Sequence, residues 1–143
     1  MEDELRIKKD EIKNMNQESE KIKSFTDLNA WKEGHKLVLE IYKITQKFPK
    51  EEIFGLTNQI RRAVVSFTSN IAEGFSRNSY KEKVQFYSIS LGSLTEVQNQ
   101  LLIARDIGYI DKDEFNKIAE ITVVANKITN GLIKKSKSMI HNS

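Results

Sequence analysis

Apolar side chains recur at helical spacing along most of the chain and divide it into amphipathic segments. The clearest segment spans residues 59–77, where about 100° of rotation per residue gathers an apolar face; its members are Ile60, Ala63, Val64, Phe67, Ile71 and Gly74. The opposite face carries Arg62, Ser66, Ser69 and Glu73. An ordinary solvent-facing helix surface is rich in charged residues. Small hydroxyls between an arginine and a glutamate instead predict close contact with another backbone or with a polar ligand.

Capping and breaking residues separate this segment from its neighbours. Asp27 or Asn29 is expected to cap a first helix, which Pro49 ends because proline disfavours helical geometry in the residue before it. The core face of this helix includes Trp31, Gly34, Leu37, Val38, Ile41, Ile44, Thr45 and Phe48. The central helix is expected to begin near Leu56 and to close at Gly74 in the left-handed conformation.

The third amphipathic segment, residues 79–107, carries two apolar stripes. It opens with a capping-box pattern from Ser79 to Glu82, and its expected core face consists of Phe86, Ile89, Ser93, Leu94, Val97, Leu101 and Ala104. The second stripe holds Val84, Leu91 and Leu102, with Tyr87 and Gln98 beside them. One stripe suffices for a helix in a monomeric bundle, so the second stripe predicts an oligomer interface that also includes Arg62, Ser66, Ser69 and Glu73.

A fourth helix is expected after Asp111, which caps it together with Glu114. Its core face holds Phe115, Ile118, Ile121, Thr122, Ala125, Thr129 and Leu132. Four long helices with short connections predict an all-α, antiparallel up-down-up-down four-helix bundle over residues 25–143. Residues 1–24 are predicted to be a polar N-terminal extension, either a frayed or disordered helix or one strand of a weak coiled coil, because too few apolar residues are present there to bury much surface.

Composition narrows the class of protein. A chain of 143 residues is long enough for one domain with one core. Cysteine is absent and the two histidines, His35 and His141, are far apart, so no disulfide, thiol nucleophile or metal site is expected. No catalytic or cofactor motif occurs, so we expect no enzyme and no cofactor. No apolar run reaches the roughly 18 residues of a membrane span, and the acidic start does not resemble a signal peptide, which predicts a cytoplasmic protein without membrane contact.

Positive charge is concentrated in two parts of the sequence. Formal net charge is only +3, but residues 121–143 contain four lysines and no acid. The candidate phosphate-binding residues are Arg61, Arg62, Arg77 and Lys81 around the second loop, and Lys134, Lys135 and Lys137 near the end. Two alternatives stay open: the terminal lysines complement a helix dipole, and Arg62 pairs with Glu73 or with an acid of the next subunit. Most aromatic residues fall on predicted core faces, so no stacking platform for bases is expected.

Five motifs in order and in spacing carry a family resemblance. They are Asp27-Leu28-x-Ala30-Trp31-Lys32-x-Gly34-His35, Phe54-Gly55-Leu56-x-x-Gln59-Ile60-Arg61-Arg62-Ala63, Ser69-Asn70-Ile71-Ala72-Glu73-Gly74, Gly92-Ser93-Leu94-x-Glu96 and Gln100-Leu101-x-Ile103-Ala104. Over about residues 25–133 the chain resembles the four-helix-bundle proteins encoded in 23S rRNA intervening sequences, whose fold the accessory variability determinant proteins of diversity-generating retroelements share. Two positions depart from the family pattern: Thr68 stands where proline is frequent, and Ser90 where alanine is frequent.

The resemblance implies a homopentameric ring with a role in binding RNA or DNA. Two functions follow as hypotheses. The first is a non-enzymatic oligomer that binds nucleic acid through its phosphates, with weak sequence preference and strong salt dependence. The second is a protein-interaction scaffold that docks a larger partner, such as a reverse transcriptase, on the same basic surface.

Overall fold

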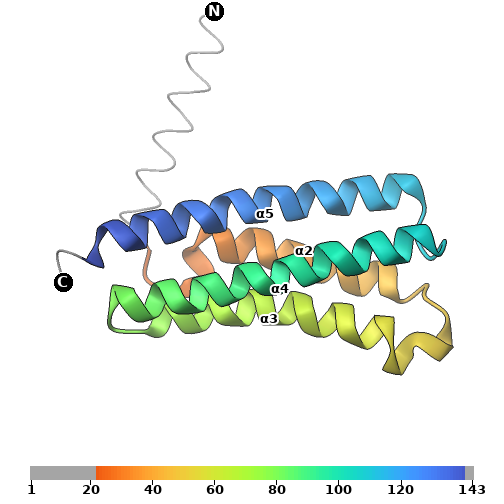
Figure 1. Ribbon diagram of the computed structural model, residues 1–143, viewed down its shortest axis with the longest axis horizontal. Coiled ribbons are helices and arrows are strands. Elements are labelled where there is room, and N and C mark those ends of the chain that lie inside the picture. The colour runs from red at the N-terminus through yellow and green to blue at the C-terminus, as the bar shows by residue number, and fades with distance from the viewer. Residues whose placement is uncertain (1–21, 141–143) are drawn as a thin grey trace, which may run out of the picture.

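The computed structural model describes residues 22–140, which form four long antiparallel helices around one core (Figure 1). The helices are α2 (Asn29–Thr45), α3 (Leu56–Ser76), α4 (Tyr80–Asp106) and α5 (Lys112–Ser138), and two short 3₁₀ helices, η1 (Phe25–Asp27) and η2 (Lys50–Phe54), precede α2 and α3. Each long helix packs against the next one along the chain, and α2 also packs against α5. The predicted all-α four-helix bundle is therefore confirmed.

The predicted N-terminal extension lies largely outside the described residues. Of its 24 positions, only residues 22–24 are described. Ile22 packs against the hydrophobic core, and the side chain of Ser24 caps η1 by accepting a hydrogen bond from the backbone N–H of Thr26 at 3.3 Å. These last residues of the extension thus contact the bundle.

The core combines fully buried apolar side chains with buried hydroxyl groups. Its largest fully buried apolar members include Phe67, Leu37, Ile41, Ile60, Ile71, Leu94, Leu101 and Ile118. The buried hydroxyls donate to carbonyl oxygens of their own helices: Thr45 to Ile41 at 2.7 Å, Ser90 to Tyr87 at 2.6 Å, and Thr129 to Ala125 at 2.7 Å. Because each hydroxyl is satisfied within its helix, it can lie in the core without an unpaired polar atom.

The predicted capping box of α5 is confirmed, that of α4 is present only in its Ser79 half, and the predicted side-chain cap of α2 is wrong. Asp111 and Glu114 form a reciprocal capping box at the start of α5, and Ser79 accepts a hydrogen bond from the backbone N–H of Glu82 at the start of α4. Helix α2, by contrast, begins after Leu28 without a side-chain cap. Asp27 caps η1 instead, where its carboxylate accepts hydrogen bonds from the backbone N–H groups of residues 23 and 24.

Gly74 does not close α3 in the left-handed conformation. The helix continues to Ser76, and among the described residues only Gly108 has a positive φ, of 83°, at the end of α4. Gly74 is required for another reason. A Cβ atom there would lie 2.7 Å from Cε1 of Tyr87 and 3.0 Å from Cβ of Phe86, so the absence of a side chain lets α3 and α4 approach closely.

The buried face of α4 is rotated from the expected one. Tyr87 and Ser90 are buried, whereas Ile89 is 53% exposed and Phe86 is half-buried. The remaining expected members, from Ser93 to Ala104, do face the core. The error arose because Tyr87 and Ser90 are polar by residue type, although the Ser90 hydroxyl is satisfied within α4.

Candidate functional site

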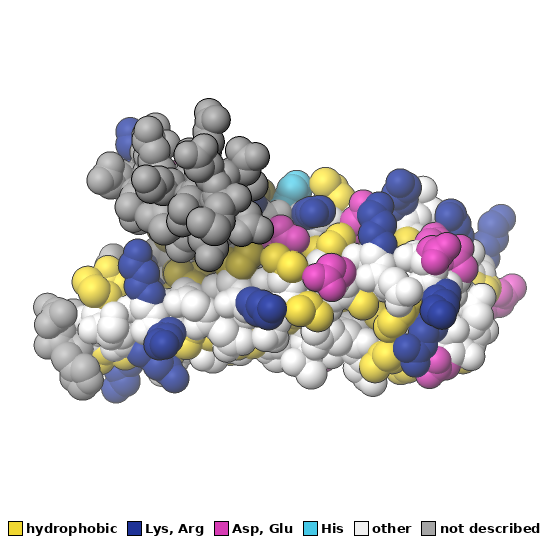
Figure 2. Space-filling model, turned by 90° about the horizontal axis from the view of Figure 1, so that it is seen from above, with side chains coloured by type: hydrophobic (Ala, Val, Ile, Leu, Met, Phe, Trp, Pro, Cys, Tyr) yellow, Lys and Arg dark blue, Asp and Glu magenta, His cyan; other side chains and the backbone are white. Residues whose placement is uncertain are grey.

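The antiparallel topology gathers five of the seven candidate basic residues at one end of the bundle. Arg77 follows the last residue of α3, Lys81 lies in the first turn of α4, and Lys134, Lys135 and Lys137 lie in the last turns of α5. These elements meet at the same end in Figure 1. On the face in Figure 2, this end shows basic side chains without acidic ones, whereas the middle and the opposite end show basic and acidic side chains together. We call this cluster, with Lys83 added, the basic end.

Most cations of the basic end are free to meet an external anion. Lys81, Lys134, Lys135 and Lys137 are exposed, and no described residue forms an ion pair with any of them. Two of the α5 lysines lie in its last turn, where they also complement the negative end of the helix dipole. The dipole alternative and a phosphate-binding role are thus compatible at these positions.

Arg77 is held by contacts within the protein. Its guanidinium pairs with Glu73 and lies over the ring of Phe86, 4.6 Å from the centroid. Glu73 therefore pairs with Arg77 and not with Arg62. The Arg77 Nε is buried and has no hydrogen-bond partner among residues 22–140. Because its charge is already paired with Glu73, Arg77 is less available to an external anion than the exposed lysines are.

Arg61 and Arg62 lie apart from the basic end. They are separated from Arg77 by about 15 residues of helix, which corresponds to roughly 23 Å along the α3 axis. Arg61 donates from Nε to the hydroxyl of Thr45 at 2.8 Å and covers the ring of Tyr42. Arg62 is exposed. The structure therefore does not bring the seven predicted residues together into one patch.

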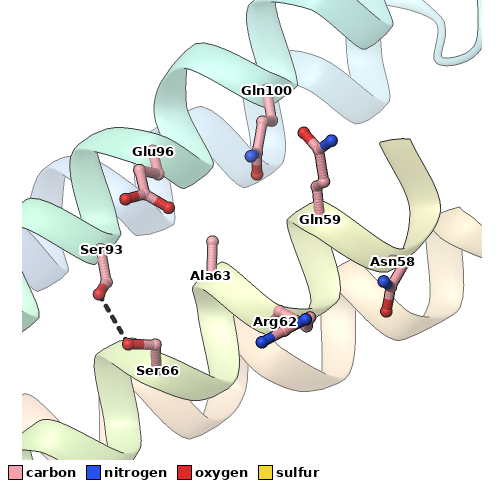
Figure 3. Close-up of a pocket in the computed structure, with 8 residues that line it drawn as sticks. All are labelled: Asn58, Gln59, Arg62, Ala63, Ser66, Ser93, Glu96 and Gln100. Atoms are coloured by element: carbon pink, nitrogen blue, oxygen red, sulfur yellow. Dashed lines mark hydrogen bonds between the residues drawn. The ribbon is translucent and has the colours of Figure 1, made fainter. Parts of the chain in front are cut away.

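Arg62 instead lines a polar cleft between α3 and α4, drawn in Figure 3. The cleft has a volume of about 440 Å³, and its walls include Gln59, Arg62 and Ser66 from α3 and Ser93, Glu96 and Gln100 from α4. Ser66 and Ser93 share a hydrogen bond of 2.8 Å at one end of the cleft.

Several polar groups that line the cleft have no ion-pair or hydrogen-bond partner among the described residues. No described residue forms an ion pair with Arg62 or with Glu96. The Oε1 atom of Gln100 is buried and accepts no hydrogen bond from the described part of the chain. An unpaired buried acceptor is costly, so this cleft is suited to a polar group supplied from outside the chain.

The predicted oligomer-interface residues fall into separate groups. Val84 and Leu91 are partly buried and pack against the core of their own bundle. They lie on the side of α4 that faces α5, since Gln98, two turns beyond Leu91, donates to Thr122 at 3.2 Å. Leu102, at 42% exposure, remains open to a partner. Ser69 and Glu73 are exposed on α3. The second stripe is thus explained in part by packing against α5.

An aromatic pocket at the basic end was missed by the sequence analysis. It has a volume of about 190 Å³ and is lined by Phe75, Tyr80, Tyr87 and Leu132, with Lys83 and Lys135 among its other residues. Burial raises the pKa of Tyr87 to about 12. The sequence signal was present in Phe75 and Tyr80, which flank the second loop, but these aromatics could not be distinguished from core residues by periodicity.

Lys83 links this pocket to the α3 terminus. Its ammonium group donates to the carbonyl oxygen of Phe75 at 2.6 Å and lies 5.3 Å from the centroid of the Phe75 ring. Desolvation lowers the pKa of Lys83. Because its position is fixed by the carbonyl of α3, Lys83 places a cation beside an apolar cavity.

Within residues 22–140, no three acidic or histidine side chains are arranged to hold a metal ion. Among the helices of the same range, none combines the length and apolar character that crossing a bilayer requires.

Comparison with known proteins places these features in a family context. The model of the family described as 23S rRNA-intervening sequence protein matches residues 26–131. A crystal structure of a protein of unknown function from the S23 ribosomal protein family of Bacteroides thetaiotaomicron VPI-5482 superimposes with a TM-score of 0.68 at 21% identity, over 73% of this chain and 95% of that one. At this identity the likeness shows the fold alone. No curated protein matches the chain.

Proposed function

Because this chain belongs to the 23S rRNA-intervening sequence protein family, we propose that it is a non-enzymatic, oligomeric protein that binds RNA or DNA through its basic end. The observation that carries the proposal is the convergence of exposed lysines from α4 and α5 at one end of the bundle. Lysine neutralises phosphate as a point charge. Contacts of this kind track the nucleic-acid backbone, so affinity depends on salt more than on base sequence.

A mobility-shift assay across a salt series tests this function. The full chain is titrated against a structured RNA hairpin and a DNA duplex of equal phosphate number at about 50 to 200 mM salt. We expect shifted complexes whose affinity falls by orders of magnitude over that range, because each phosphate contact releases counterions. No shift of either probe at the lowest salt would overturn the nucleic-acid proposal and favour the scaffold that docks a larger protein.

Self-assembly, in a ring of five, is the second part of the proposal. Two features support association: exposed apolar side chains, and the polar groups of the cleft that no described residue pairs with. Phe54 is 91% exposed, and Ile89, Leu102 and Ile103 of α4 and Ile107 directly after it are each more than 40% exposed. In a ring, each basic end would be repeated five times, so that weak single contacts would sum through multivalency.

Light scattering tests assembly, with Leu102→Glu as the disrupting variant. The native chain should give about five times the subunit mass of 16.5 kDa, whereas burying an unpaired charge at Leu102 should shift the mass toward the monomer. Leu91 is unsuitable as a probe because it packs against its own core. Leu39→Glu on α2, at a position of 58% exposure outside the predicted interface, is the matched control. A native monomer at micromolar concentration would contradict the ring.

Arg62→Gln separates the two roles left open for this residue. If Arg62 meets an acid of the next subunit, the variant should lose assembly mass while it keeps its helical content, since no described residue of its own chain pairs with it. If Arg62 contacts phosphate, the variant should keep its mass and bind nucleic acid less tightly. Light scattering and the mobility shift on the same preparation distinguish these results.

A further inference from the structure

We propose that the aromatic pocket at the basic end receives one unpaired base of the bound nucleic acid. The inference rests on the proposed function and deepens it, because it names the structural class of ligand: RNA or DNA with a bulged or otherwise unstacked nucleotide. Three observations support it: the pocket has an aromatic lining, two lysines form part of that lining, and the other lysines of the basic end lie at the same end of the bundle.

The lining suits a flat, largely apolar ring. Phe75 and Tyr80 are half-buried and contribute partly accessible aromatic rings, Tyr87 lines the pocket as a buried side chain, and Leu132 and Met139 contribute aliphatic groups. The volume of about 190 Å³ is below the range of roughly 300–1,000 Å³ typical of pockets for drug-sized ligands, which fits a single ring system. Stacking on aromatic side chains accepts any base because every base has a π face.

The charges at the pocket favour a base attached to a phosphate backbone over an apolar protein side chain. Lys83 and Lys135 both line the cavity. Lys81, Lys134 and Lys137 belong to the same end of the bundle. A strand whose phosphates contact the exposed lysines would therefore bring its bases to the pocket.

The base must be unpaired to enter. A base within a duplex has to leave its stack first, at a cost that is smallest where it is already unpaired. Two polar groups of the pocket are already engaged, since the Lys83 ammonium donates to the carbonyl oxygen of Phe75 and the Ser136 hydroxyl donates to that of Leu132. Stacking on the aromatic rings does not depend on which base is stacked. The preference we infer is therefore for unpaired structure and not for base identity.

Two RNA hairpins test the inference. One carries a single bulged 2-aminopurine, and the other is the same hairpin without the bulge. We expect the full chain to bind the bulged hairpin about tenfold more tightly, the lower part of the range for one base stacked on aromatics. The 2-aminopurine fluorescence should be quenched on binding. Equal affinities, or unchanged fluorescence in the bound complex, would overturn the inference while leaving the proposed function intact.

Substitution of Tyr80 locates the effect in the pocket. Tyr80→Ala should abolish the preference for the bulge and leave affinity for the paired hairpin unchanged, whereas Tyr80→Phe, which keeps the ring, should retain the preference. Circular dichroism confirms that each variant is folded. Equal losses for both hairpins would show that Tyr80 supports the fold or the backbone contacts, and would contradict the inference. Failure of the native chain to bind either hairpin would contradict the proposed function itself.

Discussion

Replacing Gly74 with alanine will make the bundle less stable than the corresponding replacement of Gly92, by about 1–3 kcal/mol. Both glycines lie within helices, so alanine improves helix propensity by about 1 kcal/mol at each. Only at Gly74 does the new methyl meet other atoms. It would lie 2.7 and 2.9 Å from two ring carbons of buried Tyr87, whereas a Cβ at Gly92, its own helical backbone and chain neighbours aside, would have no heavy atom of the described residues within 4 Å.

Urea unfolding followed by circular dichroism measures this difference. Gly92→Ala should raise the free energy of unfolding, and Gly74→Ala should lower it relative to that control. Because both variants gain the same helix propensity, the difference between their free energies of unfolding reports the effect of the new methyl group on the close approach of α3 and α4. Equal stability of the two variants would mean that the Tyr87 ring moves aside at little cost and that the contact does not set the helix spacing.

Replacing Lys134, Lys135 and Lys137 together by glutamine should produce the largest loss of nucleic-acid affinity. If each lysine neutralises one phosphate, the slope of log affinity against log salt should become shallower by about 0.9 per lost contact with duplex DNA. The fold should be retained, because all three side chains are exposed and no described residue pairs with them. Their removal also weakens the dipole interaction at the end of α5, by less than about 1 kcal/mol each.

The matched control removes the same charge from the opposite end. Lys43, Lys50 and Lys112 are exposed and lie near the end of α2, in η2 and at the start of α5. Replacing these three lysines by glutamine gives the same net charge as the triple variant of the basic end, but it should change nucleic-acid affinity much less. Similar losses in both triple variants would show that net charge, and not the basic end, determines binding.

The architecture followed from sequence because local signals agreed with one another. Asp111 and Glu114 predicted the start of α5 correctly, and Gly108 marked the end of α4. An antiparallel bundle also places the α3–α4 loop beside the end of α5, so the grouping of Arg77 and Lys81 with the terminal lysines could be anticipated.

The errors arose where tertiary contacts decided the outcome. Gly74 carries the same sequence signal whether it ends a helix or permits a close crossing, and only the position of Tyr87 distinguishes the two. Ser90 stands where the family often has alanine, and it is buried because its hydroxyl donates within its own helix. Thr68, at a frequent proline position, similarly donates to the carbonyl oxygen of Val65 at 3.1 Å.

The candidate site was harder to predict than the fold. Periodicity assigned Val84 and Leu91 to an interface because it does not show that α4 packs against both α3 and α5. The aromatic pocket depends on how Phe75, Tyr80 and Leu132 from three helices meet. No local pattern encodes such a meeting point.

The uneven distribution of charge along the bundle has a kinetic consequence for any polyanionic ligand. A molecule with an excess of positive over negative side chains at one end turns in the field of an approaching polyanion, so that this end leads the encounter and the association rate rises. The Debye length is about 8 Å at physiological ionic strength, so this orientation acts mainly over the last few ångströms of approach. Added salt should therefore slow association as well as weaken the final complex, and the aromatic pocket, which lies at the leading end, should be among the first surfaces to meet the ligand.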